Sequence, residues 1–262
     1  MTSIIPSAEL SKLILVGATG KLGKSISKNN HVTYGICSKD NPYSGKLIDN
    51  IQKPLISSLS ELSTEVTSDF MVIDASDPEN FDNVYDFCFK NKIPLVLAST
   101  GHHQKQLNKL NRLAKEIAVL KAPNLSEGIA FFKKEILMPI IKLIKKKADN
   151  IDFLDDESLS SKLEIKIIET HHEKKKDAPS GTALDLKDFI QKNLNPLEIE
   201  IESIRDKSSI GKHEVTFTIN NEEFIVSHNA LSREIFGEGI NLALSLKDKN
   251  PGIYSMADLL KA

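Results

Sequence analysis

The stretch KLILVGATGKLGKSISKN, residues 12–29, decides the fold. It begins with a five-residue apolar run that contains β-branched side chains and stops at Gly17. Glycines then recur at positions 17, 20 and 23, and Leu22 and Ile26 lie four residues apart, as on one face of a helix. This order predicts a strand, a glycine turn and a helix.

The G-x-x-G-x-x-G spacing suits a dinucleotide site for physical reasons. The first glycine permits the tight turn out of the strand, the second lets the backbone approach a pyrophosphate, and the third lets the helix pack close to the sheet. N–H groups at the helix N-terminus then face the phosphate charge. Glycine-rich turns also arise for structural reasons alone, so the motif gains weight from its place after the first strand of an alternating series.

Further strands and helices alternate after this stretch. Apolar runs predict strands at residues 31–38, 69–76, 93–100 and 117–122, with helices at 79–91 and 103–115. Continuous apolar strands that alternate with helices indicate a parallel sheet covered on both faces. We therefore expect a Rossmann-type dinucleotide-binding domain over residues 1–125.

The sequence pattern changes near Asn124. A long amphipathic segment spans 128–147, and apolar and polar residues alternate at 163–169, 198–204, 213–219 and 222–228, around a helix at 180–193. Such alternation is typical of a sheet with one buried face, and Asn220-Asn221 suits a hairpin turn. We expect an α/β fold whose C-terminal α+β domain, residues 126–234, has an open, mostly antiparallel or mixed sheet. Helices near 235–246 and 256–260 are expected to pack back on the first domain.

Composition excludes several classes of protein. The 262 residues carry 34 basic and 36 acidic side chains, so the charge balance does not favour a nucleic-acid partner. No apolar run is long enough to span a membrane, and the segment MTSIIPSAELSK lacks the pattern of a secretory signal. Cys37 and Cys88 lie in apolar runs without metal-ligand spacing, which predicts buried, inert thiols. We expect a cytoplasmic protein.

The carboxyl ends of the other parallel strands supply candidate cofactor contacts. After the second strand, Lys39 would favour the 2′-phosphate of NADPH, whereas Asp40 would favour the ribose of NADH. Small and polar residues follow the fourth and fifth strands, where Gly, Asn and Pro also serve as ordinary turn residues. These candidates are Ala98, Ser99, Thr100, Ala122, Pro123, Asn124 and Leu125.

The most unusual stretch is ETHHEKKKDAPSGTALDL, residues 169–186. His171 and Lys175 are four residues apart and could face one pocket, while Ser180, Gly181 and Thr182 at a helix start form an anion cradle. A solvated loop is the alternative interpretation of the charged run. A metal site is disfavoured, because adjacent histidines point apart on a strand and no third ligand is evident.

This stretch resembles the signature of the dihydrodipicolinate reductase family, the 4-hydroxy-tetrahydrodipicolinate reductases, which follows E-x-H-H-x-x-K-x-D-A-P-S-G-T-A. Glu169, His171, His172, Lys175 and residues 177–183 match. The resemblance extends to GATGKLG, ASTGH, APNLSEG and SHNALSREIFGEGINLAL, and so covers nearly the whole chain.

The resemblance implies NADPH- or NADH-dependent reduction of a cyclic dicarboxylate, 4-hydroxy-tetrahydrodipicolinate, in diaminopimelate and lysine biosynthesis. It implies a homotetramer built through the second sheet. Another two-domain NAD(P) oxidoreductase and a nucleotide-binding sensor remain alternatives.

The resemblance also implies a role for each site residue. His171 would be the proton donor and acceptor, Lys175 a second proton donor, and His172, Ser180, Gly181 and Thr182 would bind substrate. The nucleotide would contact Gly17, Ala18, Thr19, Gly20, Lys21, Leu22 and Lys39, together with Ala98, Ser99, Thr100, Ala122, Pro123, Asn124 and Leu125.

Overall fold

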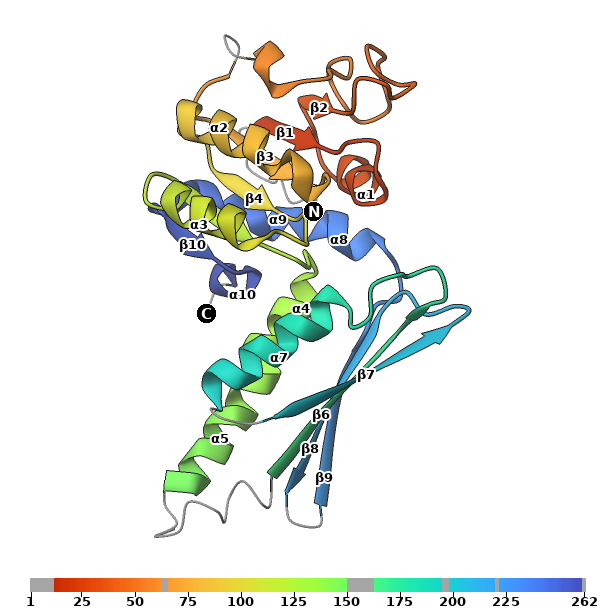
Figure 1. Ribbon diagram of the computed structural model, residues 1–262, viewed down its shortest axis with the longest axis vertical. Coiled ribbons are helices and arrows are strands. Elements are labelled where there is room, and N and C mark those ends of the chain that lie inside the picture. The colour runs from red at the N-terminus through yellow and green to blue at the C-terminus, as the bar shows by residue number, and fades with distance from the viewer. Residues whose placement is uncertain (1–11, 63–65, 150–162, 195–197, 220–221, 261–262) are drawn as a thin grey trace, which may run out of the picture. The chain divides into compact units, whose positions relative to one another are not determined.

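The structure, a computed structural model, describes residues 12–62, 66–149, 163–194, 198–219 and 222–260. It divides into two compact units. The first comprises Met1–Glu127 and Glu234–Ala262, and the second comprises Gly128–Arg233 (Figure 1). The predicted turn at Asn220-Asn221 and the N-terminal segment before Lys12 lie outside the described residues.

The first unit contains a six-stranded sheet in which every paired strand is parallel. The strand order is β10-β5-β4-β3-β1-β2, and the parallel pairing confirms the predicted Rossmann-type sheet. The strands are β1 (Lys12–Val16), β2 (Tyr34–Ile36), β3 (Phe70–Asp74), β4 (Leu95–Leu97), β5 (Ala118–Lys121) and β10 (Gly252–Tyr254).

Helices bury both faces of this sheet. Helices α2 (Phe81–Asn91) and α3 (Gln104–Leu113) pack Phe81, Val84 and Leu110 against one set of alternating strand residues, which includes Ile14 and Val72. The other strand residues, such as Leu15, are buried on the opposite face. The helix α1 (Lys21–Asn29) and the C-terminal helix α8 (Glu234–Glu238) pack closely together. Burial on both faces explains why these strands are continuous apolar runs.

The return of the chain to the sheet differs from the expectation in one element. Helices α8, α9 (Ile240–Ala243) and α10 (Met256–Leu259) lie where helices were predicted. Between them, the structure adds strand β10, which pairs with β5. The strand has only three residues, GIY, and none of them is fully buried, so it lacks the apolar run that identified the other strands.

The second unit contains a mixed sheet in the order β7-β6-β8-β9, which agrees with the predicted class. The strands are β6 (Leu163–His172), β7 (Ile199–Asp206), β8 (Lys212–Ile219) and β9 (Glu222–Asn229), and only β6 and β7 pair in parallel. Helices α5 (Met138–Asp149) and α7 (Gly181–Asn193) cover one face (Figure 1). The core there joins Leu137, Ile141 and Leu186 to Ile167 and Phe217.

The segment predicted as one amphipathic helix is three consecutive helical pieces. These are α4 (Glu127–Phe131), a π-helical stretch η3 (Phe132–Leu137) and α5. Lys133 in the π-helical stretch is buried and forms an ion pair with Asp185 of α7, with 2.8 Å between Nζ and Oδ2. Among the described helices, none is both long and apolar enough to cross a membrane.

Strand β6 carries its two-residue period from the core into polar sequence. Leu163, Ile165 and Ile167 are buried, and the next two residues on the same face are Glu169 and His171, which are also buried. Because side chains alternate between faces along a strand, the pattern that buries the leucine and isoleucines also buries a carboxylate and an imidazole. Those two groups need partners at that depth.

Candidate functional site

A cavity of about 470 Å³ lies in the first unit at the carboxyl ends of β1, β2 and β3. Strand β1 lies between β2 on one side and β3 on the other, so the strand order reverses at this point. Ligands of doubly wound sheets bind at such points. The lining residues are Val16, Gly17, Thr19, Ile36, Cys37, Ser38, Ser57, Ser58, Leu59, Ser76, Asp77, Glu79, Asn80 and Asn83.

The glycine turn beside this cavity requires its glycines. Gly17 has φ +81°, and a Cβ there would lie 2.5 Å from the carbonyl oxygen of Ala75. A Cβ on Gly23 would lie 2.2 Å from the carbonyl oxygen of Gly17. Gly20 precedes α1 without a side-chain cap, and the first amides of a helix have no acceptor within it. The turn therefore fits the pyrophosphate of a dinucleotide.

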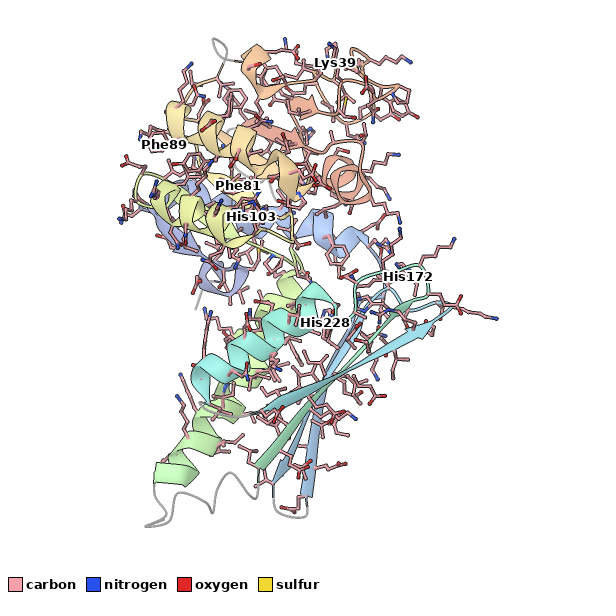
Figure 2. The ribbon with its side chains drawn as sticks, viewed as in Figure 1. Lys39, Phe81, Phe89, His103, His172 and His228 are labelled. Carbon is pink, nitrogen blue, oxygen red and sulfur yellow. The ribbon has the colours of Figure 1, made fainter. Side chains whose placement is uncertain are left out.

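The cavity gathers only some of the predicted nucleotide contacts. Gly17 and Thr19 line it, whereas the side chain of Lys39 is exposed beyond the end of β2 (Figure 2). Its neighbour Ser38 lines the cavity instead. The candidates that follow β4 and β5 are not among its lining residues, nor are Ala18, Gly20, Lys21 and Leu22.

The residues after β4 are held by a buried aspartate. The hydroxyl of Ser99 donates to Oδ2 of Asp74 at 2.8 Å, and its amide donates to the Asp74 carbonyl at 3.0 Å. Asp74 itself is fully buried at the end of β3. The Ser99 hydroxyl is thus directed into the sheet edge, while Thr100 is exposed.

The segment after β5 is also braced by its own chain. The amide of Ala122 donates to the carbonyl of Leu97 at 3.0 Å, and Asn124 Oδ1 accepts from the amide of Ser126 at 2.8 Å. Pro123 is partly exposed and Leu125 is buried.

Sequence reasoning missed the polar residues after β3 and those at 57–59. Asp77 caps the short helix η2 (Pro78–Asn80) by accepting from the amide of Glu79 at 3.0 Å. The strand-end rule, applied to DASDPEN as it was to the other strands, would have identified Asp77 and its neighbours. The 57–59 segment follows no strand, so the sequence offered no signal for it. Cys37 and Cys88 are free and buried, as predicted, and burial raises the pKa of both thiols.

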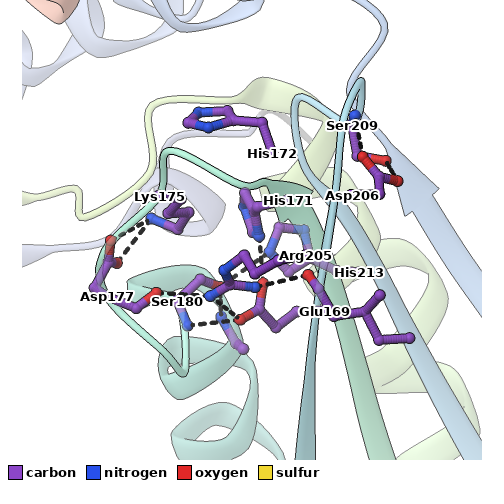
Figure 3. Close-up of polar contacts among 12 residues, drawn as sticks. Glu169, His171, His172, Lys175, Asp177, Ser180, Arg205, Asp206, Ser209 and His213 are labelled. Carbon is purple, nitrogen blue, oxygen red and sulfur yellow. Dashed lines mark hydrogen bonds and ion pairs between the residues drawn. The ribbon is translucent and has the colours of Figure 1, made fainter.

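The second unit brings the titratable residues of the signature together (Figure 3). Glu169 and His171 lie near the end of strand β6, where the register sets Glu169 opposite His213 of β8 and His171 opposite Arg205 of β7. Nδ1 of His171 contacts Oε2 of Glu169. Arg205 and His213 were not predicted, because only strand pairing brings them to this point.

Lys175 lies in the turn that follows β6. Its amide donates to the His172 carbonyl at 3.0 Å, and its Nζ donates to both carboxylate oxygens of Asp177, at 2.9 and 2.7 Å. Burial raises the pKa of Asp177, but the hydrogen bond and charge of Lys175 outweigh it, so that pKa lies below its ordinary value. The Lys175 charge also reaches His171, whose protonation it disfavours.

The predicted anion cradle is the N-terminus of α7. Ser180 is its N-cap: its hydroxyl accepts from the amide of Ala183 at 3.1 Å and contacts Nε2 of His213 at 3.3 Å. A Cβ on Gly181 would meet nothing within 4 Å, so the backbone there is open to a ligand. Thr182 is buried in the first turn. The first amides of this helix, rather than the Ser180 hydroxyl, are suited to hold a carboxylate.

Two more histidines, His172 and His213, lie at this site and differ in their surroundings. His172 turns to the face opposite His171, and its Nε2 lies 2.7 Å from Nη2 of Arg233. His213 is buried edge-on to His171, with ring centroids 5.2 Å apart. Burial, with the nearby His171 and His228, lowers the pKa of His213 to about 3. His213 is therefore neutral at physiological pH and leaves proton exchange to His171. Within the described ranges, no three His, Cys, Asp or Glu side chains are grouped to hold a metal ion.

Comparison with known proteins bears on both units. Family models of the N-terminus and the C-terminus of dihydrodipicolinate reductase match residues 11–125 and 142–260. The chain belongs to the dihydrodipicolinate reductase family. It is accordingly an oxidoreductase of diaminopimelate and lysine biosynthesis whose cofactor is NADH or NADPH.

Individual relatives of the family match over the full length. The 4-hydroxy-tetrahydrodipicolinate reductase of Caldanaerobacter subterraneus subsp. tengcongensis is 33% identical, over 95% of this chain and 98% of its own. That of Clostridium novyi is 32% identical, over 97% and 99%. Dipicolinate-bound dihydrodipicolinate reductase from Paenisporosarcina sp. TG-14 shares the fold, with a TM-score of 0.70 at 19% identity over 94% of this chain and 97% of that one.

Proposed function

We propose that this chain is a 4-hydroxy-tetrahydrodipicolinate reductase, which reduces 4-hydroxy-tetrahydrodipicolinate to tetrahydrodipicolinate with NADH or NADPH. Its full-length relatives bear that name. The observation that carries the proposal is the cluster at the end of β6, where His171, Lys175 and the start of α7 lie together in one network. A proton donor beside an anion cradle is what reduction of an unsaturated cyclic dicarboxylate requires.

The residues of the second unit divide the chemical work. The bound nucleotide supplies a hydride. His171 delivers the proton that must follow: imidazole is the side chain suited to proton transfer near neutral pH, and burial lowers the pKa of His171, which makes its protonated ring a stronger acid. Lys175 is a second proton donor and stabilises negative charge on the substrate, while its ion pair with Asp177 holds it at the site.

The substrate carboxylates are bound at two places. One accepts hydrogen bonds from the first turn of α7, at Gly181 and Thr182, while Ser180 holds that turn in shape. The other faces His172, whose contact with Arg233 brings a permanent cation to the same place. The N-terminus of α7 and the Arg233 cation beside His172 thus each bind one carboxylate of the substrate. A ring analogue without carboxylates would lack both contacts.

The nucleotide occupies the first unit at the glycine turn. The pyrophosphate would lie against the turn at residues 17–22, of which Gly17 and Thr19 line the cavity, and the adenosine ribose would lie toward the end of β2, where Ser38 lines the cavity and Lys39 follows. The nicotinamide contacts Ala98–Thr100 and Ala122–Leu125. Ser38 is uncharged, so the two exposed residues after it decide the preference: Lys39 favours NADPH, whereas Asp40 favours NADH. Binding of each nucleotide to the wild type and to Lys39→Ala, measured in parallel, tests this: equal loss for both would remove Lys39 from the choice.

We extend the proposal to assembly and location. The enzyme is a cytoplasmic homotetramer joined through the sheet of the second unit. Exposed apolar side chains on the face of that sheet opposite the helices support it: Ile204 and Ile225 are 40% and 57% exposed. Light scattering on the wild type and on an Ile204→Glu, Ile225→Glu variant measures the assembly. A monomeric wild type would contradict the tetramer.

A coupled assay tests the reaction. Aspartate semialdehyde and pyruvate are supplied with the upstream synthase, and oxidation of NADPH or NADH is followed at 340 nm. We expect oxidation only when both the synthase and this enzyme are present. A rate of nucleotide oxidation no higher than that of the blank without synthase would contradict the proposal. It would favour one of the alternatives, a different two-domain oxidoreductase or a nucleotide-binding sensor. Nucleotide binding without turnover would favour the sensor.

A further inference from the structure

Glu169 is a buried carboxylate that neither proton delivery nor substrate binding has used so far. Its side chain has 0% exposure. Its donors include Nδ1 of His171, which meets Oε2, and Nη2 of Arg205 at 2.9 Å and the backbone amide of Ser180 at 3.3 Å, which both meet Oε1. A carboxylate at this depth is stable only when it is paired and hydrogen-bonded in this way.

We infer that Glu169 is the positioning residue of the site, which fixes the tautomer of His171 and ties that imidazole to the carboxylate cradle. The inference rests on the proposed function, in which His171 moves the proton. A carboxylate at Nδ1 requires hydrogen there, so the neutral ring keeps Nε2 unprotonated and ready to exchange a proton. Nε2 of His171 lies beside Gly211: a Cβ added to Gly211 would lie 3.1 Å from that nitrogen.

The connection to the cradle has two routes. One is direct, through the amide of Ser180, the N-cap of α7. The other runs through Arg205, whose Nη2 also donates to the carbonyl of Asp177 at 2.7 Å. Asp177 in turn holds Lys175. One buried carboxylate therefore sets the distance between the proton donor, the second cation and the anion-binding helix start (Figure 3).

The charges around His171 give this arrangement a measurable consequence. The groups that face it are Glu169 on its own strand, Lys175 in the next turn, Arg205 on β7 and neutral His213 on β8. Burial lowers the pKa of His171, and the Glu169 charge opposes that fall. Burial raises the pKa of Glu169, but its hydrogen bonds from Arg205, Ser203 and His171 outweigh this, so it is ionised across the working pH range.

Glu169→Gln tests the inference, with Glu173→Gln as the matched control. The control makes the same chemical change on an exposed side chain of the following turn. We expect Glu169→Gln to lower kcat at least tenfold and to shift the His171 limb of the pH profile of kcat/KM to lower pH by about one unit, because a stabilising charge is lost. Glu173→Gln should match the wild type in both. If Glu169→Gln lowers kcat but leaves the His171 limb of the pH profile where it is in the wild type, Glu169 has only a structural role and the inference is wrong.

A second measurement does not depend on turnover or on any variant of Glu169. In wild-type protein labelled with ¹⁵N-histidine, the neutral His171 ring is expected as the Nδ1–H tautomer, with the resonance assigned through His171→Asn. An Nε2–H tautomer would overturn the inference even if the reductase assay succeeds. If the coupled assay fails while the Nδ1–H tautomer is found, the proposed function falls and the Glu169–His171 arrangement stands.

Discussion

The two units build their sites from opposite materials. The first surrounds its cavity with backbone, glycines and small polar side chains, and its glycine turn leaves almost no space for an added Cβ. The second places titratable side chains in contact, with Glu169, His171 and Arg205 sharing buried hydrogen bonds. The first site should therefore be sensitive to added volume and the second to altered charge. Four experiments test this difference, in order of decreasing effect.

Removing a charge from the second site should have the largest effect on turnover. We expect Lys175→Ala to lower kcat/KM by on the order of 10²–10⁴-fold, about 3–5 kcal/mol of transition-state stabilisation. Lys176→Ala is the matched control, because that side chain is exposed in the same turn. Steady-state kinetics with the coupled assay measure both. Equal activity of the two variants would remove Lys175 from the chemistry.

Adding one methyl group to the first site should impair it without any change of charge. In Gly23→Ala the new Cβ would lie 2.2 Å from the Gly17 carbonyl, so the turn and helix α1 must separate. We expect a loss of stability of about 2–3 kcal/mol and at least tenfold weaker nucleotide binding. Thermal unfolding and fluorescence titration measure these. Gly20→Ala, where the same contact is 3.3 Å, should lose less stability. The reverse order would contradict the packing of this turn.

Acid should weaken the second unit through His213. Its pKa is about 3 in the folded protein against an ordinary value of 6.5, so the unfolded chain binds the extra proton between those values and stability falls as pH decreases from 6.5 toward 3. Between pH 7.5 and 5 this single group accounts for about 2 kcal/mol. Urea unfolding of the wild type and of His213→Gln, each at both pH values, isolates the effect. An equal acid loss in both proteins would argue against it.

The smallest effect concerns a glycine of the second unit. A Cβ on Gly181 meets nothing within 4 Å, so Gly181→Ala should leave the melting temperature and nucleotide binding unchanged. It should raise the substrate KM about tenfold, roughly 1.4 kcal/mol, because the methyl group occupies the space beside the cradle. A lowered melting temperature with unchanged KM would show that this glycine serves the fold, as Gly23 does.

Residue patterns predicted the first fold better than the second site. Apolar runs and glycine spacing predicted five parallel strands, because a strand buried on both faces is a nearly continuous run of apolar residues. The sequence did not predict strand β10, because its three residues are not fully buried and the strand depends on pairing with β5. The HHEKKKDAPSGT stretch identified His171, Lys175 and the cradle as candidates, whose roles remain proposals. Arg205 and His213 lie on other strands, and no local pattern reveals which strand pairs with which.

The late position of strand β10 has a consequence during synthesis. A ribosome delivers β1 to β5 first, then the whole second unit, and only afterwards Gly252–Tyr254. Until that last strand emerges, β5 carries an unpaired backbone edge, which is a template for association between chains. Tyr254 pairs with Leu120 of β5 but follows the whole second unit in the sequence, so this edge stays open while Gly128–Arg233 is made. Truncations that remove Gly252–Tyr254 should aggregate even though both sites are complete.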